Sequence, residues 1–279
     1  MTSWLYISPL MLVLIPFFVL PILVVLVASV FETDGFGGLI PTFTLANYGT
    51  VLTSGLTYNL YFETVKFTIL TWFFTLLLGF FVAYFLVFHV RNPLLAIGLF
   101  LICTVPFWTS NIIRMISWIP LLGKEGLINS ALLHLGLIHE PLEFLLYSGF
   151  AVVVAYVHQL TIFMIVPIFN SMSRIDRSLI EAAYDAGASG WQTLWNVVVP
   201  LTRPGIVIGS IFVVTIVIGD YVTIGVMGGQ QIASIGKVIQ VQLSYLQFPL
   251  AAANAVVLLA VVLMIIWGMT RLVDIRAEL

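Results

Sequence analysis

Residues 173–206 read SRIDRSLIEAAYDAGASGWQTLWNVVVPLTRPGI, a polar stretch between two long apolar runs. Ser178 followed three residues later by Glu181 predicts a capping box, in which two free backbone donors at a helix start are satisfied. A helix is therefore expected to begin there and to run through small alanines. Gly187 is suited to end it, because glycine adopts the left-handed backbone conformation at no steric cost.

A second short helix is expected from about Gly190 to Val198. Ser189 can cap its start, and Pro200 is expected to end it because a proline ring cannot continue a helix. The pattern thus predicts a helix, a glycine bend and a second helix in this polar stretch. Glu181 and Asp185, four residues apart, place two carboxylates on one face, so this shape suits a groove on another protein.

The rest of the chain is strongly apolar. Of 279 residues, 61% are hydrophobic and 8% are charged, with 21 Phe and a mean hydropathy of +1.16. A soluble domain carries about 25% charged residues, so lipid must cover most of this chain. The formal charge of −2 does not indicate nucleic acid as a partner. One cysteine, Cys103, excludes a disulfide framework and a thiolate metal cluster.

Six apolar runs are long enough to cross a membrane as helices, which predicts an all-α membrane protein formed by one transmembrane domain over 1–279. The runs are about 5–31, 62–88, 94–119, 147–172, 205–226 and 250–272. The first run is too long for a secretory signal and has no clear cleavage site, so it is expected to be retained as a span. The segment 173–204 is then the one long connection on its side.

Basic residues near the ends of the runs predict the orientation. Six arginines fall on one side if both termini share it: Arg91, Arg174, Arg177, Arg203, Arg271 and Arg276. The opposite side has 32–61 without Lys or Arg, and then Lys124 and Lys237. Both termini and 173–204 are therefore expected in the cytoplasm. On the outer side, 126–136 is either a helix on the membrane surface or a re-entrant helix under the other spans.

The sequence contains no recognisable catalytic motif. Gly123-Lys124 and Gly236-Lys237 lack the spacing and the Ser or Thr of a phosphate-binding loop. The four histidines form no pair at metal-binding helical spacing. Ser189 in GASG does not match a nucleophile elbow. Catalysis, a metal site and a cofactor on this chain are therefore not expected, and the energy for any active transport would come from a partner or from an ion gradient.

The polar stretch resembles the EAA loop of permease subunits in bacterial ATP-binding-cassette (ABC) importers, written EAA-x3-G-x9-I-x-L-P. Glu181-Ala182-Ala183, Gly187 and Pro200 match it, and two apolar valines, Val197 and Val199, replace Ile and Leu. The resemblance implies a coupling helix that docks into an ATPase subunit and transmits its closure to the spans. A plain amphipathic surface helix is the alternative.

A wider resemblance points to the spermidine/putrescine-type permease subfamily. It rests on FTLANYGTVL (43–52), VPFWTSNIIRMISWIPLLGKEGLIN (105–129) and GDYVTIGVMGG (219–229). It implies the type I ABC importer permease fold in a bacterial inner membrane. It further implies a second permease subunit, which is expected to be a related chain, two ATPase subunits that hold ATP and Mg, and a periplasmic solute-binding protein. The implied substrate is a polyamine or another small, including cationic, solute.

Asp220 is the clearest charge inside an apolar run, and Tyr221 follows it. A carboxylate beside an aromatic ring could contact a passing ammonium group. The alternative is that Asp220 pairs with Arg114 or Lys66 and holds helices together.

Two further groups are candidates for the translocation path. Trp108, Asn111 and Arg114 recur every three residues and would share a stripe on one helix, although tryptophans near span ends commonly anchor the interface. Tyr156 and Gln159 are three residues apart in the fourth run, where hydrogen bonding between helices is the alternative.

The leading hypothesis is an importer permease that contributes half of a central path. A secondary transporter with Asp220 as the coupling carboxylate is the main alternative, although no inverted repeat is visible. A scaffold or receptor that uses 178–198 to hold a cytosolic protein is the third.

Overall fold

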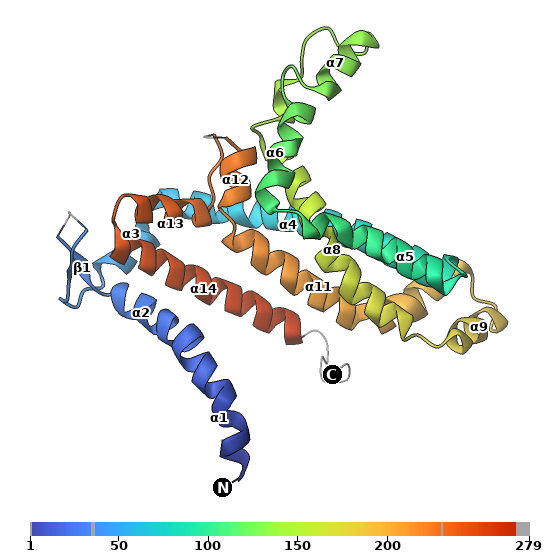
Figure 1. Cartoon of the computed structure of the whole chain (residues 1–279), viewed down its shortest axis with the longest axis horizontal. Coiled ribbons are helices and arrows are strands. Elements are labelled where there is room, and N and C mark those ends of the chain that lie inside the picture. Colours follow the sequence, from blue (N-terminus) through green and yellow to red (C-terminus); the bar gives the residue numbers. More distant parts are fainter. Residues whose placement is uncertain (1, 35–36, 230, 272–279) are drawn as a thin grey trace. The chain divides into compact units, whose positions relative to one another are not determined.

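The computed structural model describes residues 2–34, 37–229 and 231–271, and Arg276 lies outside them. The chain is mainly helical, with one small antiparallel strand pair (Figure 1). Five helices are long and apolar enough to cross a membrane, or six if one bent pair is counted as a span. This confirms the all-α membrane fold. The single predicted domain divides into two compact units, which are described separately.

The first unit runs to Phe62 and includes Ser234–Leu263. Its elements are α1 (Thr2–Leu14), η1 (Ile15–Val19), α2 (Leu20–Ala28), β1 (Glu32–Thr33), β2 (Leu39–Ile40), α3 (Ala46–Thr53), the start of α4 (Gly55–Tyr84), α13 (Ile235–Ser244) and most of α14 (Phe248–Arg271). The span Ser8–Ala28 has none of its residues buried. Most of its large apolar side chains, from Leu10 to Val27, are exposed.

Polar contacts fix the end of this first span. Ser29 is fully buried, and its hydroxyl lies 2.7 Å from the hydroxyl of Tyr48 on α3. The Asn47 amide donates to the carbonyls of Ser29 at 3.0 Å and Phe31 at 2.9 Å. In β1 and β2, Glu32 pairs with Ile40 and Thr33 with Leu39. The FTLANYGTVL segment thus holds the connection where it leaves the first span.

The second unit comprises Glu63–Ala233 and the end of α14 from Met264. Besides most of α4, its elements are η2 (Phe85–His89), α5 (Pro93–Thr104), η3 (Val105–Trp108), α6 (Asn111–Leu122), α7 (Leu127–His134), η4 (Glu143–Leu145), α8 (Gly149–Ser173), α9 (Arg177–Asp185), α10 (Gly190–Thr193), η5 (Leu194–Val198), α11 (Val199–Gly219) and α12 (Val222–Met227). Its core follows α8, whose buried residues extend from Ala151 to Met172.

Small residues let α11 pack closely against α8. A Cβ atom added at Gly205 would lie 2.4 Å from the Pro167 carbonyl oxygen, and one at Gly209 would lie 2.7 Å from the Met164 sulfur. Gly205 and Gly209 form the small-xxx-small spacing typical of close membrane helix pairs. The Trp72 indole of α4 also donates to the Ser210 hydroxyl at 2.8 Å. Close backbone approach on α11 therefore holds the centre of this unit together.

The third predicted span is broken. Its two parts, Leu94–Trp108 and Asn111–His134, are bent by 91° at Thr109 and Ser110. Trp108 ends a 3-10 turn, and Thr109 and Ser110 have extended backbone angles. The run 94–119, which is predicted to be a membrane span, is therefore formed by two helices joined at a sharp bend. The other predicted runs each contain a long helix, but the run 205–226 breaks at Asp220.

A lobe formed by residues 123–143 projects beyond α6 and carries α7 (Figure 1). Asn129 is fully buried at its centre. Its amide donates to the carbonyls of Gly123 at 3.0 Å and Leu142 at 3.2 Å, and it accepts from the Leu142 N–H at 2.8 Å. One side chain therefore closes both ends of the lobe. A helix is present within 126–136, and its place relative to the membrane stays a prediction.

Asn129→Ala is expected to destabilise the lobe by about 2–4 kcal/mol, because three hydrogen bonds are lost while their buried backbone partners remain. Limited proteolysis of the purified full-length protein would measure it as faster cleavage within 123–143. Lys124→Ala is the matched control, since it removes only the exposed 2.5 Å ion pair with Glu143. Equal cleavage of the two variants would contradict the central role of Asn129.

Candidate functional site

The loop between α8 and α11 begins at a cap that differs from the predicted one. The Asp176 carboxylate accepts a hydrogen bond from the Ser178 N–H at 2.9 Å, and α9 starts at Arg177. The predicted capping box of Ser178 and Glu181 is therefore wrong. Aspartate is a strong N-cap and stands two residues ahead of the serine, so it takes the capping position first.

The hydrogen bond donated by the Ser178 N–H lowers the pKa of the Asp176 carboxyl below its usual value. A lowered folded-state pKa means that the cap stabilises α9 above the ordinary carboxyl range. That contribution is lost as the pH falls through the lowered pKa. The helix start is therefore fully capped at neutral pH.

Gly187 has a φ of +84°, as its predicted role at the end of α9 requires. Ser189 and Gln192 form a capping box at α10, which confirms Ser189 as its cap. Pro200 does not end this helix. The segment continues through the π turn η5 into α11, so that Gly190–Gly219 is one helix of 30 residues. Proline is tolerated in the first turn of α11, where Pro200 stands, because the π turn has already changed the hydrogen-bond register.

The residues that match the EAA motif lie on the surface of this loop. Glu181, Ala182 and Asp185 are exposed, and Ala183 is partly buried. The sequence interpretation missed two tryptophans beside them. Trp191 is 68% exposed and Trp195 53%, and their rings meet edge to face at 5.7 Å. An exposed pair of large aromatic rings at spacing i, i+4 is the signal that could have been read, since such rings are enriched in protein interfaces.

The loop also meets the end of α4. Glu181 and Tyr184 line a cavity of about 290 Å³ together with Tyr84 and His89. The lining combines carboxylate, phenol and imidazole groups with apolar side chains. Residues of α9 therefore lie beside the end of the second span.

Two helix breaks stand just before helices that pack against each other, α6 and α12. The break at Thr109 and Ser110 precedes α6, and the break at Asp220 and Tyr221 precedes α12. Helix α12 packs against both α6 and α8 (Figure 1). Discontinuous helices expose backbone groups and are typical of substrate sites in transporters. Both breaks therefore adjoin the contact between α6 and α12.

Asp220 caps α12. One carboxylate oxygen accepts from the Val222 N–H at 2.8 Å, and the other accepts from the Thr223 hydroxyl. Its predicted alternative partners do not pair with it in the described part of the chain, where Lys66 pairs with Glu63. Asp220 is partly exposed, and the adjacent Tyr221 is 45% exposed. The carboxylate is therefore held in place by its cap while part of its surface stays open.

Trp108, Asn111 and Arg114 do not share one helical stripe, because the break separates Trp108 from the other two. Trp108 is 84% exposed, whereas Arg114 is 7% exposed. Arg114 donates to the Asn111 side chain and to the Thr109 carbonyl oxygen, the latter at 3.3 Å. Arg114 therefore bridges the bend, and the predicted common face is wrong.

Tyr156 and Gln159 lie on the buried side of α8, with exposures of 0% and 6%. The Tyr156 hydroxyl is buried and has no hydrogen-bond partner among the described residues. His158 points elsewhere and accepts from the Trp118 indole at 3.2 Å. Tyr156, His158 and Gln159 all lie on α8, which packs against α6 and α12.

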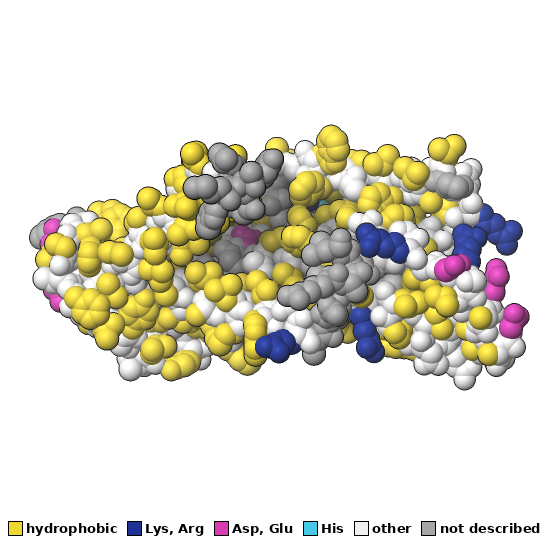
Figure 2. Space-filling view, turned by 90° about the horizontal axis from the view of Figure 1, so that it is seen from below, with side chains coloured by type: hydrophobic (Ala, Val, Ile, Leu, Met, Phe, Trp, Pro, Cys, Tyr) yellow, Lys and Arg dark blue, Asp and Glu magenta, His cyan; other side chains and the backbone are white. Residues whose placement is uncertain are grey.

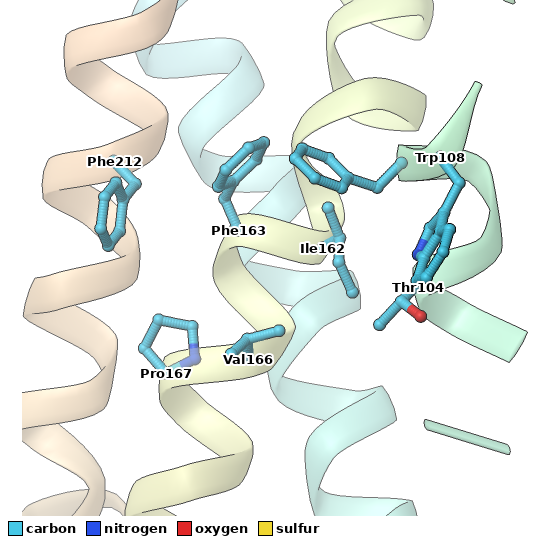
Figure 3. Close-up of a pocket in the computed structure, with 8 residues that line it drawn as sticks. Thr104, Trp108, Ile162, Phe163, Val166, Pro167 and Phe212 are labelled. Carbon is cyan, nitrogen blue, oxygen red and sulfur yellow. The ribbon is translucent and has the colours of Figure 1, made fainter. Parts of the chain in front are cut away.

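Below the first break, an apolar cavity of about 460 Å³ opens between η3, α8 and α11 (Figure 3). Phe163 stands at its centre and meets Phe107 edge to face at 5.5 Å and Phe212 at 6.1 Å. Trp108 and Thr104 lie on one side and Phe212 on the other (Figure 3). The cavity brings three phenylalanines together and suits alkyl or aromatic groups.

This arrangement of spans, coupling loop and broken helices is that of a membrane permease. Residues 75–276 match the family model described as "Binding-protein-dependent transport system inner membrane component", and the chain belongs to that family. It is therefore a multi-pass inner-membrane protein and the permease subunit of an ABC importer. Nothing in the comparisons supports the alternative of an ion-driven secondary transporter.

Among its relatives is the spermidine/putrescine transport system permease protein PotB of Escherichia coli (strain K12). It is 34% identical over 272 residues, which are 95% of this chain and 97% of PotB. PotB of Haemophilus influenzae (strain ATCC 51907 / DSM 11121 / KW20 / Rd) is 30% identical, over 95% of this chain and 93% of the relative. The similarity thus extends from the first span to the last.

Solved structures support the fold independently. A bacterial ABC transporter involved in the import of the acidic polysaccharide alginate matches with a TM-score of 0.75 and 16% identity, over 97% of this chain and 95% of its own. The MetNI methionine ABC transporter matches with a TM-score of 0.56 and 18% identity, over 81% of this chain and 99% of its own. The type I importer permease fold is therefore confirmed.

Proposed function

We propose that this chain forms one half of the translocation path of an importer for small cationic solutes of the polyamine type. The observation that carries the solute class is the 34% identity to PotB of Escherichia coli over 95% of the chain. A partly open carboxylate beside an exposed tyrosine, Asp220 and Tyr221, supports it. An ammonium group could pair with the first and lie over the ring of the second.

The proposed assembly contains a second permease, which is a related chain, two ATP-binding subunits and a periplasmic solute-binding protein. A bacterial alginate ABC transporter whose fold is similar to that of this chain has been solved in complex with a periplasmic protein. This similarity supports the periplasmic solute-binding protein as a partner. ATP and Mg would be held by the ATP-binding subunits. Both termini and the loop 173–204 would face the cytoplasm, which agrees with the six arginines on that side.

Energy would enter at α9 and α10, where the exposed Glu181, Asp185 and Trp191 meet an ATP-binding subunit. Helix Gly190–Gly219 then leads without interruption from this loop to Asp220. At a rise of about 1.5 Å per residue, its 30 residues span about 45 Å, enough to cross the bilayer. Closure of the ATP-binding subunits would therefore move the Asp220 break and the adjoining α12 directly.

Asp220→Asn is expected to lower spermidine uptake at least about tenfold, because it removes the charge that faces the ammonium group. The cap of α12 should survive, since asparagine caps helices as well as aspartate does. Uptake of radiolabelled spermidine by cells expressing the whole complex would measure the loss. Copurification of the subunits would report assembly.

Asp220→Ala is the matched control, since it removes both the charge and the cap. It should lower stability by about 1 kcal/mol in addition to reducing uptake. Wild-type uptake by Asp220→Asn would reject the cation contact. Loss of assembly in Asp220→Asn would instead assign the carboxylate a structural role.

A further inference from the structure

A third cavity lies where η2, the start of α5 and the end of α8 come together, just before the coupling loop. It has a volume of about 290 Å³. Arg91 and Arg177 both line it, together with the apolar side chains of Ala96, Ile97 and Phe169 and the Ser173 hydroxyl. The sequence suggested these arginines only as markers of orientation. The structure brings them to one cavity although they are far apart in the chain.

Glu181 stands one helical turn after Arg177 on α9, and it lines the other cavity of about 290 Å³ rather than this one. Within the described residues, neither Arg91 nor Arg177 belongs to an ion pair, and both are exposed. The closest acidic neighbour in sequence, Asp176, already accepts the Ser178 N–H at the start of α9. Figure 2 shows Lys and Arg side chains on a largely hydrophobic face, with Asp and Glu side chains near some of them. Among the described residues, the lining of the cavity itself holds two arginines and no carboxylate, so it can take a negatively charged group.

The walls below the arginines belong to membrane-spanning helices. Ala96 and Ile97 lie in the first turns of α5, and Phe169 lies near the end of α8, stacked on Phe100 at 4.7 Å. Ile97 is 55% exposed, so this wall is open to an apolar neighbour. A ligand that fits must therefore be anionic at one end and apolar at the other.

We propose that an anionic phospholipid of the bilayer binds here, with its phosphate between Arg91 and Arg177 and an acyl chain along Ala96, Ile97 and Phe169. Guanidinium groups bind phosphate oxygens through paired, charge-assisted hydrogen bonds. Basic pockets between spans at the cytoplasmic side of a membrane suit such headgroups. Ser173 also lines the cavity, and its hydroxyl donates to the Asn170 carbonyl oxygen at 3.0 Å.

The site would connect the lipid with the coupling loop. Arg177 is the first residue of α9, and Arg91 lies in the short turn between η2 and α5. Arg177 also lines the cavity in which Glu181 and Tyr184 meet the end of α4. A bound phosphate would therefore hold the start of the coupling helix against the turn between the second and third spans. Transport by the complex would then depend on anionic lipid.

The test uses the purified full-length chain in detergent with two added lipids, dioleoyl phosphatidylglycerol and dioleoyl phosphatidylcholine. Native mass spectrometry counts the lipid retained. Wild-type protein is expected to retain the anionic lipid in preference. The double variant Arg91→Gln, Arg177→Gln should lower its affinity for phosphatidylglycerol about 25-fold, at about fivefold for each arginine near the membrane surface, without changing retention of phosphatidylcholine.

Two further variants separate the site from general surface charge. Arg203→Gln removes an exposed arginine on the same side outside this cavity and should leave retention of phosphatidylglycerol unchanged. Ala96→Trp keeps both arginines but fills the apolar part, and it should lower retention of phosphatidylglycerol. Equal retention of the two lipids by wild type, or an equal loss in Arg203→Gln and the double variant, would overturn the proposal. Competition by soluble glycerol phosphate at the same concentration as the lipid would also overturn it, since the acyl chain would then contribute nothing.

Discussion

Gly205→Leu is expected to prevent the second unit from folding. A Cβ atom at this position would lie 2.4 Å from the Pro167 carbonyl oxygen and 2.6 Å from the Ser171 hydroxyl oxygen. The first contact is with backbone, which cannot turn aside as a side chain could. The remaining atoms of leucine would force α11 away from α8 at the centre of the core. The cost is expected to reach about 4 kcal/mol or more.

The measurement is the yield of monodisperse protein from membranes, followed by thermal unfolding of whatever is recovered. Gly98→Leu is the matched control, because a Cβ atom at Gly98 in α5 meets nothing within 4 Å. It should leave the yield close to wild type. Equal yields for the two leucine variants would show that α8 and α11 do not depend on close approach at Gly205.

Gly187→Arg is expected to abolish copurification of the ATP-binding subunit while the chain itself still folds. The φ of +84° strains any residue with a Cβ atom, at a cost of about 1–2 kcal/mol in this region. No atom lies within 4 Å of an added Cβ, so the fold of the spans is unaffected. The strain and the long charged side chain would instead change the angle between α9 and α10 at the proposed docking surface.

Two variants make this result specific. Gly187→Asn should retain most copurification, because asparagine tolerates the left-handed conformation better than other residues. Gly136→Arg introduces the same strain at a φ of +67° in the lobe after α7, where an added Cβ also meets nothing within 4 Å. It should leave the ATP-binding subunit attached. Full copurification with Gly187→Arg would remove the docking role of the loop.

The membrane fold and the bend at Gly187 could be predicted because composition and glycine conformation are local properties. Hydropathy identifies apolar segments from their composition alone. It contains no information on the direction of the helix axis, so it does not predict the 91° bend within 94–119. Arg114 could have signalled the bend, since a buried guanidinium needs carbonyl partners that a regular helix does not offer. It finds one in Thr109 at the break.

The capping errors have a related cause. The capping-box pattern considers only Ser178 and Glu181. It does not include Asp176, which stands two residues earlier and accepts a hydrogen bond from the Ser178 N–H. Asp220 was noticed for its charge, yet its cap on α12 depends on α11 ending at Gly219, and only the folded chain determines that point. The cavity lined by Arg91 and Arg177 could not be predicted at all, because it joins segments about 80 residues apart.

The helix from Gly190 to Gly219 joins the coupling loop at one end to Asp220 at the other. A rotation of the helix at the loop would therefore displace its other end. For a helix of about 45 Å, a tilt of about 10° moves the far end by about 8 Å, more than the diameter of a small solute's ammonium group. The irregular points of this helix are the π turn at Leu194–Val198 and the prolines Pro200 and Pro204, which all lie in the half next to the loop. The half beyond them, up to Gly219, is regular helix and can move as a rigid piece. Small rotations of the ATP-binding subunits would thus be enlarged before they reach Asp220.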